Sequence, residues 1–361
     1  MTTLAQRAAK TTNRPKSAKS KLVPLAITII SAAVIVALTY VLPPFRNYQL
    51  ATIGAYLCVT AGLTVLTGLN GQLSLGHGAL MATGAYTLAL WQDKFNLLLP
   101  GIVVAIAVTT LVGAVIGLAA ARLRGPYLAG LTLAVAVVVP SITSTFDNTF
   151  NSDQGLSVAL DPPPGVIPVE QWQAWISWAA ALLTVLLLAY VIRGRFGRDM
   201  RAVRDDETAA KLAGVSVART QVMAFVISSA CAGLAGALFA VLAQSVSPGA
   251  FPLTLSLFLV MAIVIGGLGR LSGALIGAFL LVALPAVAQS IGENAGSQRL
   301  EGNLSLTFFG VVLVAVMLAA PGGLAALIPS GIPRRKAKNE THRDRPRRAA
   351  AGRRLQQRKQ Q

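Results

Sequence analysis

Residues 47–92 read NYQLATIGAYLCVTAGLTVLTGLNGQLSLGHGALMATGAYTLALWQ and contain no charged side chain. A helix needs about 20 apolar residues to cross a bilayer, so this stretch is long enough for two crossings. It is interrupted by the run Gly68–Gly78, which holds four glycines, and glycine readily leaves helical geometry. The stretch therefore predicts two transmembrane helices with a break between them.

Uncharged stretches of similar length surround this one on both sides. They are Leu22–Phe45, Phe95–Ala121, Gly125–Phe146, Gln171–Ile192, Thr220–Gly269, Leu271–Gly292 and Gly302–Pro333. The stretch Thr220–Gly269 again has room for two helices, with an interruption at Ser247–Gly249 and Pro252. With 54% hydrophobic and only 12% charged residues, the chain is predicted to be an all-α polytopic membrane protein. We expect about ten transmembrane helices within residues 22–333, of which one or two can be re-entrant.

The formal net charge of +18 is concentrated in two terminal segments. Residues 1–21 carry six Lys and Arg and no acid, whereas residues 334–361 carry twelve against two acids. Neither segment holds an aromatic residue for base stacking, so a nucleic-acid partner is not expected. We expect both segments to fix the topology and to contact anionic membrane lipids, and the C-terminal one to be disordered.

The positive charges also predict the orientation, because Lys and Arg accumulate in cytoplasmic loops. An N-terminus in the cytoplasm places the basic loops on one side, and with ten spans the C-terminus joins them. These loops contain Arg122 and Arg124, residues 193–219, and Arg270. The largest outer loop is then 147–171, which is polar and proline-rich, and Trp172, Trp175 and Trp178 just after it are predicted to form an interfacial anchor belt.

The glycine-rich break contains four polar residues, Asn70, Gln72, Ser74 and His77. Polar groups at membrane depth are costly and normally face the protein interior or a water-filled path. Transporters with discontinuous helices use such breaks to contact a solute, so these residues are predicted to border the path or its gate. A second interpretation is that they only form hydrogen bonds between packed helices. His77 has no second metal-binding residue nearby, so a metal site is not expected.

A charged segment, residues 193–219, separates two uncharged stretches on the predicted cytoplasmic side. Its sequence from Arg198 to Ala213 has no helix breaker, so one short helix is expected there, with i,i+4 pairs Arg201–Asp205 and Glu207–Lys211. Gly214 is placed to end this helix in a left-handed cap. The helix is either a solvated linker or a docking element that transmits motion from a cytoplasmic motor.

A second glycine-rich segment follows Met261. Its members are Gly266, Gly267, Gly269, Gly273 and Gly277. The spacing of four between the last three predicts small residues on one helix face, where another helix or subunit can approach closely.

Several classes of function are disfavoured by what the chain lacks. No phosphate-binding loop of the type Gly-x-x-x-x-Gly-Lys-[Ser/Thr] occurs, and no catalytic constellation is apparent, so neither an ATPase nor another enzyme is expected. The uncharged stretches contain no Asp or Glu for a proton relay, which argues against a proton-coupled carrier. A sodium-coupled carrier remains an alternative, because broken helices can bind sodium through backbone carbonyls.

Three segments together carry a family resemblance. The run Gly68–His77, the charged segment 193–219 and the run Met261–Gly269 with Gly273 and Gly277 resemble the branched-chain amino acid permeases of ATP-binding-cassette (ABC) importers, and most closely the LivM-type subunit. The resemblance extends from about Tyr48 to Leu327.

This resemblance implies a multi-pass protein of the bacterial inner membrane that carries branched-chain or other small amino acids, although related permeases carry urea and amides. The implied partners are a LivH-type permease, two cytoplasmic ATPase subunits that bind the ATP, and an extracytoplasmic solute-binding protein. The segment from Arg201 to Gly214 would then sit in a cleft of an ATPase. The residues implied in this coupling are Arg201, Arg204, Asp205, Glu207, Ala209, Ala210 and Gly214.

Overall fold

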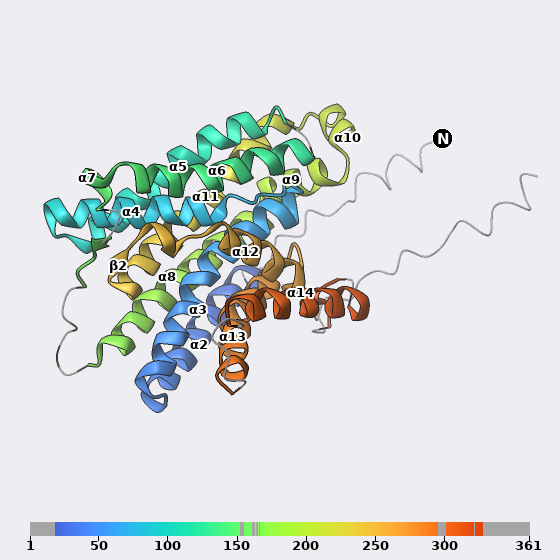
Figure 1. Cartoon of the computed structure of the whole chain (residues 1–361). Coiled ribbons are helices and arrows are strands. Elements are labelled where there is room, and N and C mark those ends of the chain that lie inside the picture. The colour runs from blue at the N-terminus through green and yellow to red at the C-terminus, as the bar shows by residue number, and fades with distance from the viewer. Residues whose placement is uncertain are drawn as a thin grey trace, which may run out of the picture. The chain divides into compact units, whose positions relative to one another are not determined.

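The structure is a computed structural model, and it describes residues 19–123, 125–151, 155–160, 163, 165, 167–294, 301–320 and 322–327. Its long elements are all helices (Figure 1). They are α2 (Lys19–Val41), α3 (Pro44–Leu63), the π-helical turn η1 (Thr64–Leu69), α4 (His77–Phe95), α5 (Leu98–Ala120), α6 (Pro126–Thr145), α7 (Asp147–Phe150), α8 (Val169–Arg193), α9 (Arg195–Asp205), α10 (Glu207–Leu212), α11 (Val217–Ala243), α12 (Leu253–Gly266), α13 (Leu271–Asn294) and α14 (Glu301–Ala319).

Seven segments of the described chain are long and apolar enough to cross a membrane. They are Pro44–Leu69, Leu98–Ala120, Tyr127–Thr145, Val169–Arg193, Val217–Ala243, Leu271–Ser290 and Phe309–Ala326. Thr28–Val41 and Leu253–Gly266 are apolar but shorter, and α4 belongs to neither group. The prediction of an all-α, multi-pass membrane protein is confirmed. The count of ten and the cytoplasmic location of both termini remain predictions, and the terminal segments 1–18 and 328–361 lie outside the described residues.

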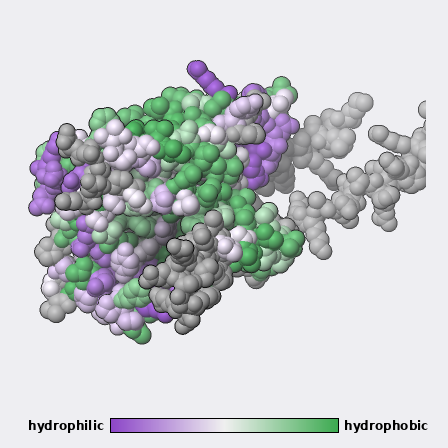
Figure 2. All heavy atoms as spheres, in the orientation of Figure 1, coloured by the Kyte–Doolittle hydropathy of each residue, from purple (hydrophilic) through white to green (hydrophobic). Residues whose placement is uncertain are grey.

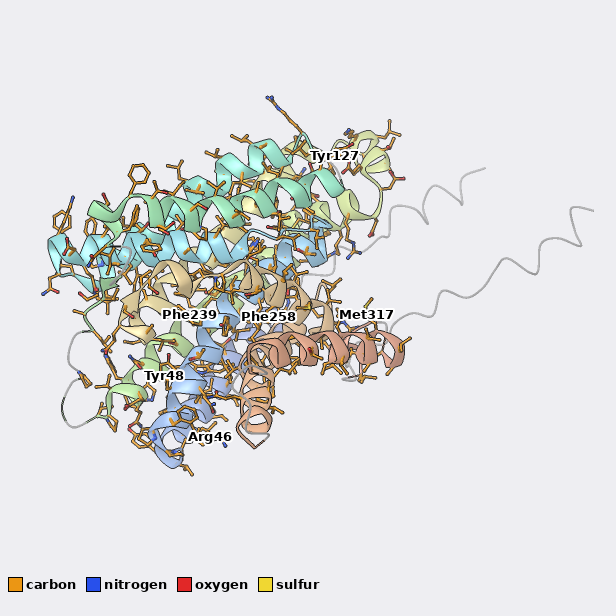
Figure 3. The ribbon with its side chains drawn as sticks, viewed as in Figure 1. Arg46, Tyr48, Tyr127, Phe239, Phe258 and Met317 are labelled. Carbon is orange, nitrogen blue, oxygen red and sulfur yellow. The ribbon has the colours of Figure 1, made fainter. Side chains whose placement is uncertain are left out.

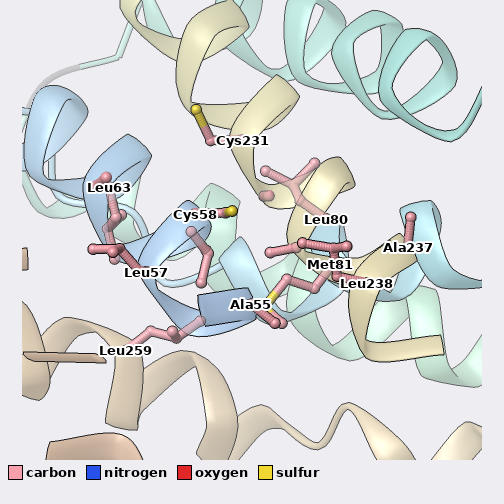
Figure 4. Packing of buried hydrophobic residues seen from close by; sticks show 14 of the residues in the cluster. Ala55, Leu57, Cys58, Leu63, Leu80, Met81, Cys231, Ala237, Leu238 and Leu259 are labelled. Atoms are coloured by element: carbon pink, nitrogen blue, oxygen red, sulfur yellow. The ribbon is translucent and has the colours of Figure 1, made fainter. Parts of the chain in front are cut away.

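The core forms around two helices, α3 and α11. In each of their candidate spans 72% of the most apolar window is buried, compared with 22% for α5 and α6. Helix α11 packs against α3, α4 and α5, and Figure 4 shows Met81 of α4 close to Leu238 of α11, with Leu57 of α3 in the same cluster. Both cysteines, Cys58 and Cys231, are free and buried in the same region.

The peripheral helices keep an apolar outer face. Large exposed side chains include Leu111 on α5, Val137 on α6 and Leu318 on α14. Figure 2 shows this hydrophobic surface between hydrophilic patches at the α9–α10 end and at the opposite end. Such a belt suits contact with lipid or with another membrane subunit, because a contiguous apolar surface is unfavourable in water.

The predicted interruption after α11 is confirmed. Gln244 adopts a left-handed conformation (φ 53°) and ends the helix, and α12 begins only after Pro252. Between them β2 (Ser245–Val246) pairs antiparallel with β1 (Leu156–Ser157) from the predicted outer loop. Two short 3₁₀ turns, η2 (Pro248–Ala250) and η3 (Leu324–Ala326), complete the elements.

The predicted tryptophan belt is wrong for at least one member. Trp178 is only 8% exposed, and its indole Nε1 donates a hydrogen bond to the Leu50 carbonyl of α3 at 2.8 Å. Trp175 similarly donates to Thr39 Oγ1 of α2 at 3.0 Å. These indoles therefore fasten α8 to its neighbours, because a buried N–H needs a partner inside the protein.

The starts of α3 and α6 lie at opposite ends of the bundle. Figure 3 shows Arg46 and Tyr48, in the first turns of α3, far from Tyr127 at the start of α6. The end of the bundle near Tyr127 is also the end where α9 and α10 lie (Figure 1). The last turns of α3 and η1 reach this end as well, which brings the glycine-rich break next to the charged segment.

Candidate functional site

The predicted break in the first long stretch is present. Helix α3 continues into η1, whose last residue is Leu69, and no helix forms again until His77 begins α4. Gly71 has φ +77°, a conformation that glycine adopts without the steric cost of a side chain. The π-helical turn before the break marks a local departure from α geometry of the kind that often accompanies function.

Asn70 and Gln72 form a buried amide pair at the start of the break. Asn70 Nδ2 donates to Gln72 Oε1 at 2.9 Å, and the two side chains are only 3% and 5% exposed. The other atoms of the two amides, Asn70 Oδ1 and Gln72 Nε2, have no hydrogen-bond partner. Leaving a buried polar atom without a partner costs about 1–3 kcal/mol of folding free energy. One hydrogen bond therefore does not satisfy both buried amides.

Ser74 and His77 belong to a different group. Ser74 Oγ contacts His77 Nδ1 at 2.9 Å, and His77 Nε2 contacts Ser228 Oγ of α11 at 2.7 Å. Both ring nitrogens of this fully buried histidine are thus satisfied inside the protein. The chain also fixes the break through Leu75, whose N–H donates to Thr132 Oγ1 of α6 at 2.9 Å.

The structure therefore divides the four predicted path residues into two pairs. Asn70 and Gln72 lie beside a cavity, whereas Ser74 and His77 hold the break against α11. Ser228 and Thr132 have no signal in the sequence, because single hydroxyl residues within apolar helices are common and carry no distinguishing pattern.

The charged segment forms two helices, so the single helix predicted between Arg198 and Ala213 is wrong. Helix α9 ends at Asp205, and Asp206 has extended geometry (φ −159°, ψ 108°). Its carboxylate accepts the backbone N–H of Thr208 at 2.8 Å and of Ala209 at 3.0 Å. Asp206 thus acts as the N-cap of α10, a role for which aspartate is strongly preferred.

The end of α10 is as predicted, but one predicted ion pair is wrong. Gly214 has φ +81° and follows the last turn of α10. Asp205 pairs with the adjacent Arg204, with Nη2 and Oδ1 2.8 Å apart, instead of with Arg201. Arg201 donates to the carbonyl of Ile192 at 3.4 Å.

Arg204 connects α9 directly to the glycine-rich break. Its Nη1 donates to the Gly68 carbonyl of η1 at 2.7 Å, across 136 positions of sequence. Its aliphatic part covers Gly71, where an added Cβ would lie 2.8 Å from Arg204 Cγ. This contact between the charged segment and the break was not apparent from sequence.

Gly68 meets a third segment at the same place. A Cβ on Gly68 would overlap the backbone N and Cα of Gly269, which lies in the loop between α12 and α13 with φ +78°. Next to Gly269, Arg270 Nη1 donates to the Ala325 carbonyl of η3 at 2.6 Å. Three loops and turns that are distant in sequence thus converge around Gly68, and we call this set of contacts the Gly68 junction.

The remaining glycines of the second run pack two helices together. Cβ atoms on Gly266, Gly273 or Gly277 would each approach backbone atoms of the facing helix within 3 Å. The prediction that Gly269 shares a helix face with Gly273 and Gly277 is wrong, because α13 begins only at Leu271. Gly267 lies in the same loop, with φ +117°, close to the carbonyl of Gly322.

A cavity of about 610 Å³ lies between the break and the charged segment. We call it the junction cavity. Its lining residues are Asn70, Gly71, Gln72, Leu73, Leu123, Gly125, Leu128, Ala129, Val203, Arg204, Asp205, Asp206, Glu207 and Gln221. Glu207 Oε1 accepts a hydrogen bond from Gln221 Nε2 of α11 at 3.1 Å, which attaches the start of α10 to the bundle.

The residues around the junction cavity are suited to contact a solute and to move relative to one another, and they do not form a recognisable catalytic group. Among the described residues, no group of three or more His, Cys, Asp or Glu could hold a metal ion. The junction cavity instead offers amides, charges and aliphatic side chains beside a broken helix that Arg204 joins to the charged segment.

Known proteins are similar in sequence to this chain over most of its length. Residues 46–320 match the family described as branched-chain amino acid transport system, permease component. The chain is 31% identical to the high-affinity branched-chain amino acid permease LivM of Escherichia coli, over 79% of this chain and 70% of that protein. It is 25% identical to LivH of Salmonella typhimurium (76% and 92% covered) and 27% identical to the ribose import permease RbsC of Escherichia coli (70% and 82% covered).

The family match covers both candidate spans that form the core, the glycine-rich break and the charged segment. It also confirms the resemblance found in the sequence. On these grounds the chain belongs to the family of branched-chain amino acid transport system permease components.

Proposed function

We propose that this chain forms half of the translocation path of an ABC importer for branched-chain amino acids, and that a cytoplasmic ATPase drives it through α9 and α10. The observation that carries the proposal is the hydrogen bond from Arg204 to the Gly68 carbonyl. It joins the charged loop, where an ATPase would dock, to a discontinuous helix of the type that transporters use at a solute path.

The coupling residues differ in what they contribute. Arg204 transmits movement to the break, and Asp205 orients Arg204 through their ion pair. Ala210 is buried against Val203 and Val217 and holds α10 on the bundle, so α10 moves with α9. Arg201, Glu207, Ala209 and Gly214 shape the surface that docks.

The path residues have distinct roles in this proposal. Asn70 and Gln72 border the inner end of the path, because they line the junction cavity. Ser74 and His77 set the position of the gate, because they attach the break to Ser228 of α11. The glycines of α12 and α13 serve packing between these helices.

The proposed assembly contains a second permease of the LivH type, two ATPase subunits and an extracytoplasmic solute-binding protein. The family membership and the apolar outer faces of α5, α6 and α14 support it. We further propose ten spans with both termini in the cytoplasm of a bacterial inner membrane, with the basic terminal segments at anionic lipid. ATP would be bound by the partners, because this chain has no phosphate-binding loop.

Reconstitution tests the energy source. Proteoliposomes are prepared with this chain, its co-encoded permease and ATPases, and the binding protein. They should accumulate labelled leucine only when ATP is present on the side of the membrane that the ATPase subunits face. Vesicles without the ATPases should show no accumulation under a sodium or proton gradient. Concentrative uptake without the ATPases would refute the proposal and favour a sodium-coupled carrier.

The variants Gly214→Val and Asp205→Asn should separate ATP hydrolysis from uptake. A branched side chain at φ +81° strains the end of α10 by about 1–2 kcal/mol, and loss of the Asp205 charge frees Arg204 from its ion pair. We expect leucine uptake to fall several-fold while ATP hydrolysis and membrane insertion persist. Gly165→Val, at φ +76° in the predicted outer loop with nothing near its side-chain position, is the matched control. Normal coupled uptake in both test variants would contradict the assignment.

A further inference from the structure

We propose that the junction cavity is a second amino-acid site, which binds the transported type of solute from the cytoplasmic side and restrains the coupling loop. This inference rests on the proposed function for its orientation, and it adds an equilibrium binding site at the inner end of the path, beside Asn70 and Gln72. The ligand class is a zwitterionic amino acid with a branched aliphatic side chain.

The amide pair at the base of the cavity has one free acceptor and one free donor. Asn70 Oδ1 can accept a hydrogen bond and Gln72 Nε2 can donate one, and neither has a partner in the protein. An ammonium group satisfies the first and a carboxylate satisfies the second, so an amino-acid backbone complements both. Both atoms are buried, so ligand binding in this proposal requires the two amide side chains to rotate toward the cavity.

The charged wall of the cavity favours the ammonium end. Arg204 contributes one positive charge, and Asp205, Asp206 and Glu207 contribute three negative charges, which leaves a formal balance of −2. Each of these four side chains is already engaged in a hydrogen bond or ion pair, so the wall is held in place. Preorganised charges bind an ion with less rearrangement than flexible ones.

The cavity also has an aliphatic part of its lining. Leu128 and Val203 are 4% and 2% exposed, and Leu73, Leu123 and Ala129 complete this part. Ligand sites usually combine such a lining with a few polar groups and have volumes of roughly 300–1,000 Å³, a range that includes this cavity. The junction cavity thus matches both ends of a branched amino acid.

An occupant would contact both elements that the coupling mechanism moves. One side of the cavity is the break at Asn70–Gln72, and the other is the α9–α10 corner at Arg204–Glu207. A ligand that bridges them favours the arrangement in which they are close. High solute on the cytoplasmic side should therefore slow further uptake.

Equilibrium binding tests the site in the assembled permease and ATPase complex, in nanodiscs without nucleotide and without the binding protein. We expect saturable binding of labelled L-leucine. 3-Methylbutylamine, which lacks the carboxylate, and 4-methylpentanoate, which lacks the ammonium, should each compete at least about 10-fold more weakly. Equal competition by either compound would overturn the zwitterion assignment.

Two glutamines provide a matched pair of variants. Gln72→Met removes the free donor and should weaken leucine binding at least about 10-fold. Gln92→Met makes the same substitution at another buried glutamine, which is 7% exposed, donates from Nε2 to the Ala159 carbonyl and lies near the C-terminal end of α4, outside the cavity lining. It should bind leucine as the unmodified complex does. Unchanged binding in Gln72→Met would refute the site.

A second variant covers the case in which Gln72→Met does not fold. Ala129→Phe places a large side chain in the cavity from its aliphatic lining and changes neither amide residue, and it should also abolish binding. A complex that takes up leucine with ATP but shows no binding in this assay would refute the inference and leave the proposed function intact. A complex that binds leucine but shows no ATP-driven uptake would refute the proposed function alone.

Discussion

Arg204→Ala is expected to reduce leucine uptake by at least about 10-fold while the assembled complex still hydrolyses ATP. The variant removes the hydrogen bond to the Gly68 carbonyl and the ion pair to Asp205. Hydrogen bonds to charged groups contribute about 1.5–3 kcal/mol, and 1.4 kcal/mol corresponds to a factor of ten in an equilibrium. Movement of α9 would then no longer displace η1. Uptake and ATP hydrolysis measured on the same proteoliposomes give the ratio that reports this loss.

A second arginine of α9 distinguishes transmission from docking. Arg195 lies on the same helix and forms an exposed ion pair with Asp199 at 3.9 Å, and among the described residues it makes no hydrogen bond to the break. Arg195→Ala should keep the ratio of uptake to hydrolysis, and Arg204→Lys should restore part of it because lysine can still donate to Gly68. Equal uncoupling by Arg195→Ala would mean that only the surface charge of α9 matters.

Gly68→Val is expected to have the largest effect on folding. The added Cβ would overlap the backbone N and Cα of Gly269, and a backbone neighbour cannot move aside as a flexible side chain can. Overpacking in a close-packed interior typically destabilises a protein by about 1–3 kcal/mol and sometimes by more. We expect a large loss of folded protein and a clear fall in Tm, measured on the detergent-purified chain by intrinsic fluorescence.

Gly130 provides the control for this substitution. It lies inside α6, is exposed, and has no atom within 4 Å of its side-chain position. Gly130→Val should leave Tm and yield nearly unchanged, because valine has a higher helix propensity than glycine. A Gly68→Val protein as stable as Gly130→Val would show that the Gly68 junction is not closely packed.

Local features of the sequence predicted local features of the structure. The uncharged stretches indicated the long helices, the run Gly68–Gly78 indicated the break, and Gly214 indicated the end of α10, because each depends on a few neighbouring residues. The single helix predicted over residues 198–213 failed at Asp206, where a side chain that caps the next helix competed with continued helix formation. The motif Asp-Asp-Glu-Thr at that position contained this signal, since aspartate is a preferred N-cap.

The amino-acid sequence by itself determined that this chain is a multi-pass helical membrane protein with a polar break and a charged loop. It could do so because bilayer insertion depends on the hydropathy of continuous segments, which the sequence displays directly. Only the tertiary structure decided which polar residues share an environment. It separated Ser74 and His77, which are joined to Ser228 through the His77 ring, from Asn70 and Gln72, which line the junction cavity. It also brought Arg204 to Gly68. Hydrogen bonds between distant segments depend on how the helices pack, and the spacing of residues along one segment does not specify that packing.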